Sequence, residues 1–211
     1  STKGLQIYIN QSRNKLKVWY QPKTRGRIEI SLPNKILIDK KFFNCLGLSI
    51  GDGLNNPNKN NTHYNFCNTN LSLVKEIYDW LTNYFKIDNT KIQVYGLTTQ
   101  DTNIETNKEE IRKVLNLNKE QSIKIYPTNR NKKLDVFIQL SNGIFQIVYL
   151  NLFKNLKKYI INNTINRRAF LTGLFAAEGH IKHSIYNTIE SISFAFNPKT
   201  EKHLAEFIKN I

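Results

Sequence analysis

Apolar and polar residues alternate along several stretches of this chain, and the alternation predicts β-strands. Within the first forty residues the pattern occurs at 16–19 and 27–30, where it predicts short strands or an extended arm. Further stretches of this kind, each typical of a strand with one buried face, are 62–68, 91–95, 122–126 and 134–140. An Asn-rich turn at 55–61 precedes the strand at 62–68, so we expect a β-hairpin there.

Elsewhere the apolar positions take helical spacing. Apolar residues between Phe42 and Ile50 recur at this spacing, and Asp39 is a suitable N-cap, so a helix is predicted that stops at Gly53. The other predicted helices are 71–87, 105–117, 143–163, 171–179 and 200–211, with a second hairpin at 180–197. The mixture of helices and short strands predicts an α+β fold.

Two nine-residue stretches, 45–53 and 171–179, are nearly the same and lie on two of the predicted helices. Each is apolar, carries small residues four positions apart and ends in one acid and one glycine. Such small residues form a narrow stripe that allows two helices to pack nearly backbone to backbone. The stripes are Gly47 with Gly51 and Gly173 with Ala177. Packing along them would place Asp52 and Glu178 side by side.

Each predicted repeat helix is followed by a hairpin and then by another helix, which predicts two pseudo-symmetric halves. The first half spans 35–163 and the second 164–211, after an N-terminal arm or set of strands at 1–34. The first half continues with further strands and another helix, whereas the second stops inside its second helix. We therefore expect the second half to be truncated.

A pair of carboxylates at the ends of two packed helices predicts a metal site. The acids would repel each other and raise one pKa unless a cation lay between Asp52 and Glu178. Backbone carbonyls at the helix ends, those of Gly51 and Ala177, would add oxygen ligands, so we expect Mg²⁺ or another hard divalent cation. Metals held over a phosphodiester can activate water and stabilise the leaving oxygen.

The alternative for each motif is structural. An acid followed by glycine is a common way for a helix to end, with Gly53 or Gly179 as a left-handed C-cap. However, the helix dipole disfavours an acid at a C-terminus. Because the acid occurs in both copies, the metal site is the favoured interpretation.

The charge of the chain predicts a polyanionic partner. Lys and Arg number 31 against 16 Asp and Glu, which gives a net charge of +15. A basic surface that serves only solubility is the alternative. Neither the two cysteines nor the four histidines have the spacing of a zinc site.

Composition and hydropathy also bear on the compartment. No apolar run is long enough to span a membrane, and no secretory signal is visible near Ser1, so an intracellular protein without a membrane partner is expected. Asn, Lys and Ile are frequent and Met is absent. An AT-rich coding sequence produces this bias, which indicates a mitochondrion or other organelle, or an AT-rich microbe.

The predicted strands offer a polar face to the polyanion. Alternation buries residues such as Ile92 and Val94 and leaves polar side chains on the other side, where they can read base edges or hold phosphates. The candidates for nucleic-acid contact on this face are Lys91, Gln93, Tyr95, Lys124, Tyr126, Asp135 and Gln139. The hairpins add Lys59, His63, Asn65, Lys182, His183 and Tyr186. A solvated sheet face without a partner remains the alternative for each of them.

Both repeats resemble the nine-residue motif of the LAGLIDADG homing endonucleases. The positions that match are Gly47, Leu48, Gly51, Asp52, Gly53, Gly173, Leu174, Ala177, Glu178 and Gly179. The resemblance covers nearly the whole chain from about Lys35. It implies αββαββα halves that form a homing endonuclease fold, with antiparallel saddle-shaped sheets in the DNA major groove.

The same resemblance implies an activity. Asp52 and Glu178 would be the metal-binding catalytic pair of an intron-homing endonuclease that makes double-strand breaks at a long, asymmetric DNA site. An intein is not expected, because the chain shows no terminal His-Asn pair and no recognisable splicing block. Many members of the family place a basic residue near the metals, from the end of the last strand. Residues 141–143, which follow the last strand of the first half, contain no lysine, so this role is assigned to no residue. The truncated second half leaves three alternatives: a fragment, a partner chain that completes the sheet, or a repurposed protein.

A repurposed protein would belong to a different functional class. One form is a catalytically inactive RNA-binding relative, either an intron maturase or a structural component of an organellar ribosome bound to ribosomal RNA. Another is a DNA-binding regulator with the same fold. The two intact acids favour the nuclease, because a structural role does not need two carboxylates in a cation site.

Overall fold

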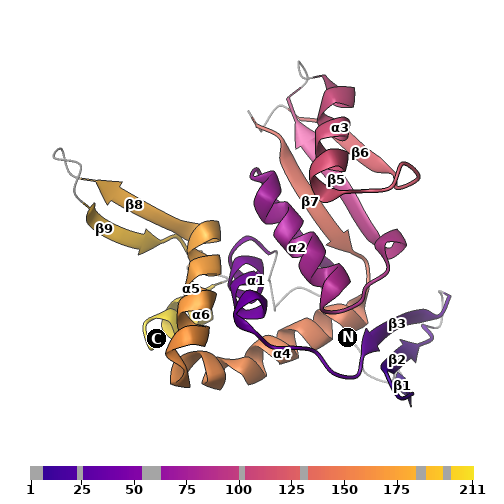
Figure 1. Ribbon diagram of the computed structural model, residues 1–211, viewed down its shortest axis with the longest axis horizontal. Coiled ribbons are helices and arrows are strands. Elements are labelled where there is room, and N and C mark those ends of the chain that lie inside the picture. The colour runs from indigo at the N-terminus through magenta and orange to yellow at the C-terminus, as the bar shows by residue number, and fades with distance from the viewer. Residues whose placement is uncertain are drawn as a thin grey trace. The chain divides into compact units, whose positions relative to one another are not determined.

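The computed structural model describes residues 7–22, 26–53, 63–99, 103–128, 133–183, 189–196 and 201–211 (Figure 1). The described helices and strands form an α+β fold with mixed sheets, which confirms the predicted class. The chain divides into two compact units. The first unit contains Ser1–Leu37 and Asn60–Leu150, and the second contains Ile38–Lys59 and Asn151–Ile211. Among the described residues, no helix combines the length and apolar character needed to cross a bilayer.

The first unit begins with a three-stranded antiparallel sheet, which confirms the strands predicted at 16–19 and 27–30 and adds a strand, Ile7–Gln11, that was not predicted. Its strands, in spatial order, are β1 (Ile7–Gln11), β2 (Lys15–Tyr20) and β3 (Ile28–Pro33). Val18, Ile30 and Leu32 are buried on one face. The side-chain amide of Asn142 donates to the carbonyl of Glu29 over 3.0 Å, which ties this sheet to the residue before α4 (Gly143–Asn162).

A four-stranded sheet with two covering helices forms the rest of the first unit. Helices α2 and α3 lie over one face of this sheet (Figure 1). In chain order the elements are β4 (Tyr64–Asn68), α2 (Leu71–Asn83), the 3-10 helix η1 (Asn89–Lys91), β5 (Ile92–Thr98), α3 (Ile104–Leu115), β6 (Ile123–Pro127) and β7 (Asp135–Leu140). Trp80 of α2 is fully buried and meets Phe85 edge to face, with ring centroids 4.9 Å apart.

The expectation of a purely antiparallel sheet is wrong. The strand order is β4-β7-β5-β6, and β5 pairs with β6 in parallel, so the sheet is mixed. The reason is the connection: α3 carries the chain from β5 back to the starting edge, and such a helical crossover joins parallel strands. Among the described residues β4 pairs with β7, and the turn that was expected to complete a hairpin at 55–61 lies outside them.

The second unit contains both repeat helices. Its elements are α1 (Lys40–Asp52), the end of α4, α5 (Thr164–Glu178), the antiparallel pair β8 (Gly179–His183) and β9 (Ile189–Phe194), and α6 (Lys202–Ile208). The Asp39 carboxylate accepts from the N–H of Phe42 over 2.8 Å, as expected for an N-cap. The β8–β9 pair confirms the second predicted hairpin.

Helices α1 and α5 touch through their backbones. A side-chain Cβ built on Gly47 would collide with the carbonyl oxygen of Phe170 and would lie 2.9 Å from the backbone nitrogen of Leu174. One built on Gly173 would collide with the carbonyl oxygen of Asn44. Only a residue without a Cβ fits at either position.

Because backbone atoms cannot give way as a side chain can, we predict that Gly173→Ala separates α1 from α5. The expected loss is about 1–3 kcal/mol in the free energy of unfolding, measured by thermal or urea unfolding. Gly26→Ala is the matched control, since no atom lies within 4 Å of a Cβ there. Its effect should stay within about 0.5 kcal/mol. Equal effects of the two substitutions would show that the helices are not held in backbone contact.

Candidate active site and nucleic-acid interface

The contact between α1 and α5 brings the four small residues of the repeats together. Gly47 and Gly173 face the backbone of the opposite helix, and a Cβ on Gly51 would collide with that of Ala177. The same Cβ would also come within 3.2 Å of the Glu178 side-chain Cγ. The last residue of α5 therefore lies against the last turn of α1.

Asp52 and Glu178 are each the final residue of their helix, and they interact electrostatically. Burial, with smaller contributions from the negative charges of Asp52 and Glu201, raises the pKa of Glu178 to about 7. Both repeat acids are half-buried. Their carboxylates are thus close enough to oppose each other's ionisation, and neutral Glu178 is favoured below about pH 7.

Glu201 is a third acid near this pair that the sequence analysis missed. It directly precedes α6 and is the N-cap residue of that helix, without a side-chain capping bond. A helix was expected from about residue 200, but no pattern in the sequence links its start to the end of α5. Only the fold brings the charge of Glu201 to bear on Glu178.

The glycines that follow the acids do not serve as left-handed C-caps. Gly53 has φ −77° and ψ 138°, and Gly179 has φ −79° and ψ 141°, both in the extended region. Both helices do end at the acid and its glycine, but the left-handed conformation expected in the structural alternative is wrong. At Gly179 the requirement is steric, because a Cβ would collide with the ring of Phe175. The N–H of Ala195 donates to the Glu178 carbonyl over 3.1 Å, which attaches the β8–β9 hairpin to the helix end.

The donor atoms at this end fit Mg²⁺. Among the described residues, no group of three or more His, Cys, Asp or Glu side chains is placed to hold a metal ion. A cation here would be held by the Asp52 and Glu178 carboxylates, and the carbonyls of Gly51 and Ala177 belong to the last turns, where they lack partners within their helices. Water and a phosphate would complete its shell. Mg²⁺ is commonly held in this way, by one or two carboxylates together with water and phosphate.

A second candidate site is the face of the four-stranded sheet in the first unit that the helices do not cover. Strand pairing places Asn65 opposite Gln139, and Gln139 opposite Gln93, so three amide side chains form a row across β4, β7 and β5. Beside this row, Tyr95 stacks on Phe137 with ring centroids 4.6 Å apart and planes at 5°. Amide and aromatic groups of this kind suit contacts with nucleic-acid bases.

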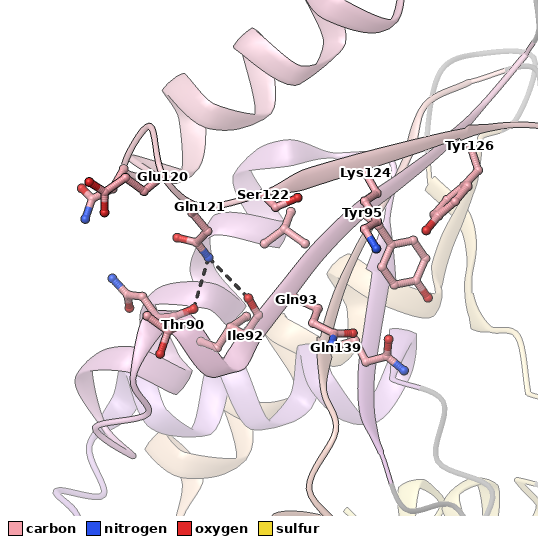
Figure 2. A pocket seen from close by; sticks show the side chains of 13 residues that line it. Thr90, Ile92, Gln93, Tyr95, Glu120, Gln121, Ser122, Lys124, Tyr126 and Gln139 are labelled. Carbon is pink, nitrogen blue, oxygen red and sulfur yellow. Dashed lines mark hydrogen bonds between the residues drawn. The ribbon is translucent and has the colours of Figure 1, made fainter.

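A cavity of about 560 Å³ lies on this face, over β5 and β6. Figure 2 shows Gln93 and Gln139 next to each other in it, with Lys124, Tyr95 and Tyr126 along the strands. Burial raises the pKa of the Tyr95 hydroxyl, so that group remains a hydrogen-bond donor at neutral pH. Five of the residues expected to contact nucleic acid therefore line one concave surface.

Gln121 and Asn118 belong to the same cavity but were not expected. The side-chain amide of Gln121 donates to the carbonyls of Asn89 and Ile92 over 3.3 Å and 3.4 Å (Figure 2). This bridge holds the loop before β6 against η1 and β5. Both residues lie in a loop where the sequence has no alternation to place a side chain on either face.

The remaining candidates are more dispersed. Lys91 is exposed at the end of η1, and His63 is half-buried before β4. In the second unit, Lys182 pairs with Glu190 over 2.9 Å, and His183 lies at an irregularity in the pairing of β8 with β9. Two further candidates, Lys59 and Tyr186, fall outside the described residues. The sheet face thus unites only part of the expected set.

The raised pKa of Glu178 predicts a pH-dependent stability. The folded chain binds the Glu178 proton more tightly than the unfolded chain, whose pKa is 4.5, so stability falls as the pH rises from that value through about 7. In thermal unfolding without divalent cations, the melting temperature of the wild type should fall more steeply over this range than that of Glu178→Gln. Mg²⁺ should reduce the fall. Parallel profiles for the two proteins would contradict the coupling.

Comparisons with protein-family models, with curated proteins and with solved structures found no match for this chain. A functional assignment for this chain therefore rests on its own residues. These provide an opposed carboxylate pair in the second unit and an amide-rich, aromatic sheet face in the first.

Proposed function

We propose that this protein is a metal-dependent, site-specific endonuclease that cuts double-stranded DNA and acts in intron homing, of the two-motif LAGLIDADG type that its repeats resemble. The observation that carries the proposal is the pairing of Asp52 with Glu178 at the ends of two helices in backbone contact. A purely structural contact would not favour two acids there, because their charges oppose each other and the helix dipoles.

The carboxylate pair suits hydrolysis of a phosphodiester. DNA brings further negative charge, which Asp52 and Glu178 alone would repel, so a cation is required between the acids and the phosphate. Bound Mg²⁺ would lower the pKa of water and stabilise charge on the phosphate and on the leaving oxygen. Both carboxylates would then be ionised ligands. In the net reaction water adds to phosphorus, the bond from phosphorus to the leaving sugar oxygen breaks, and that oxygen gains a proton.

The order of elements supports the pseudo-symmetric arrangement. In the second unit α5 is followed by the hairpin β8–β9 and by α6, and in the chain α1 is followed, after 54–62, by β4 and α2. Each motif helix therefore precedes strand and then helix. We propose that the two repeats mark two related halves that share one pair of acids.

The uncovered sheet face supports a nucleic-acid substrate. It offers an amide row for base edges, and Lys124 beside the aromatic pair for a phosphate. The net charge of +15 adds long-range attraction for a polyanion. Together with the carboxylate pair, this composition favours a nuclease over a protein that binds an uncharged ligand.

We expect Asp52→Asn and Glu178→Gln each to abolish cleavage. The wild type is incubated with a library of plasmids carrying random inserts in Mg²⁺, in Ca²⁺ and without a divalent cation, and the ends produced are sequenced. Cleavage at one recurring site in Mg²⁺ should fall at least about 100-fold in either variant, since even indirect partners of a metal are worth about 10–100-fold. Glu206→Gln, which changes an exposed acid of α6, is the matched control.

Equal cleavage by the wild type and both variants would overturn the assignment of the acids. An absence of cleavage, with tight binding to structured RNA that neither substitution alters, would instead indicate the RNA-binding relative, a maturase or a ribosomal component.

The sheet face predicts a separate effect on binding. Lys124→Ala should weaken binding to a mixed-sequence DNA duplex and reduce the slope of log affinity against log salt concentration by about 1, since one phosphate contact is lost. Lys113→Ala, on the helix that covers the other face, should leave the slope unchanged. Affinity can be measured by fluorescence anisotropy. Equal slopes for both variants would show that DNA does not contact this face.

A further inference from the structure

The N-terminal three-stranded sheet carries a concentrated positive charge that the proposed nuclease site does not use. Seven basic residues and one acid occur in residues 1–34: Lys3, Arg13, Lys15, Lys17, Lys23, Arg25, Arg27 and Glu29. This segment thus supplies a net +6 of the +15 of the chain. Those of its basic residues that the structure describes lie on β2, on the turn before it and just before β3.

One face of this sheet is an aromatic and cationic platform. Tyr8 and Trp19 are paired across β1 and β2, and their rings stack with centroids 5.5 Å apart and planes at 13°. The guanidinium of Arg27 lies over the Trp19 ring, 4.5 Å from its centroid. The next row on the same face contains Asn10, opposite Lys17.

Packing of the sheet does not explain this platform. Val18, Ile30 and Leu32 are buried on the opposite face and supply the apolar contact that holds the sheet in its unit. Tyr8, in contrast, is 41% exposed. A large aromatic side chain kept at the surface beside basic groups offers a stacking surface to a ligand.

The ion pairs on this face orient the basic side chains but are weak enough for a phosphate to replace the carboxylate as their partner. The Glu29 carboxylate forms ion pairs with Lys17 Nζ at 3.3 Å and with Arg27 Nε at 2.9 Å. These side chains are about two-fifths exposed, and pairs of that kind contribute little to stability. A phosphate can therefore compete for Lys17 while Arg27 remains over Trp19.

We propose that the Tyr8–Trp19 face of the N-terminal sheet binds single-stranded nucleic acid, either DNA or RNA. An unstacked base lies on the exposed ring of Tyr8 and extends its stack with Trp19, and phosphates contact Lys17 and the adjacent Lys15 and Arg13. Exposed aromatic rings beside basic side chains are the usual means of binding single strands without sequence preference. In a duplex the bases are stacked on each other, so their faces are not free to cover this ring.

Tryptophan fluorescence provides a local test. The chain has two tryptophans, and Trp80 is fully buried, so quenching by a stacked base reports on Trp19. Titration of the whole protein with oligo(dT) and with oligo(U) of about a dozen nucleotides should quench this emission, and a difference between the two arms identifies the preferred sugar. A duplex of the same length and heparin, which has charge without bases, should quench much less. Trp19→Phe should abolish the signal.

Substitution of Tyr8 separates stacking from charge. Tyr8→Ala should weaken oligonucleotide binding measured by Trp19 quenching about 5- to 150-fold, whereas Tyr8→Phe should retain it, because stacking does not need the hydroxyl. Tyr159→Ala removes a tyrosine of the second unit that is 51% exposed and should change nothing. Far-ultraviolet circular dichroism verifies that each variant is folded.

The proposal is overturned if Tyr8→Ala binds within twofold of the wild type, or if heparin quenches as strongly as either single strand. The outcome is independent of the nuclease site. Asp52→Asn removes the acid proposed for cleavage and should leave the quenching curve unchanged, so a failure of one proposal is distinguishable from a failure of the other.

Discussion

The backbone contact between α1 and α5 is the constraint on which the second unit depends. At Gly47 and Gly173 the carbonyl of one helix occupies the space that a Cβ would need on the other. This contact fixes the helices against sliding, because any shift would bring larger side chains into the same space. It also places the last residues of the helices together, so the glycines determine where the carboxylates meet.

That geometry carries an electrostatic cost. Burial of the Glu178 carboxyl, together with the negative charges of Asp52 and Glu201, raises its pKa to about 7. An amide in place of either acid would remove this unfavourable interaction between charges. That both are present is typical of a functional site, where a local rule of stability is broken for the sake of chemistry.

The first unit presents polar and aromatic groups by a different principle. Residues distant in sequence, Asn65, Gln93 and Gln139, share one row because strand pairing aligns them. In the N-terminal sheet the same cross-strand alignment stacks Tyr8 on Trp19. Each of these two sheets buries apolar side chains on one face and carries polar and aromatic side chains on the other.

The sequence by itself determined most of the helices and strands and the inward or outward direction of their side chains, because period and capping are local properties of a chain. It also singled out Asp52, Glu178 and the small residues between α1 and α5. Only the tertiary structure decided the parallel pairing of β5 with β6 and the influence of Glu201 on Glu178. These features depend on contacts between segments far apart in sequence, and no local pattern of residues encodes such contacts.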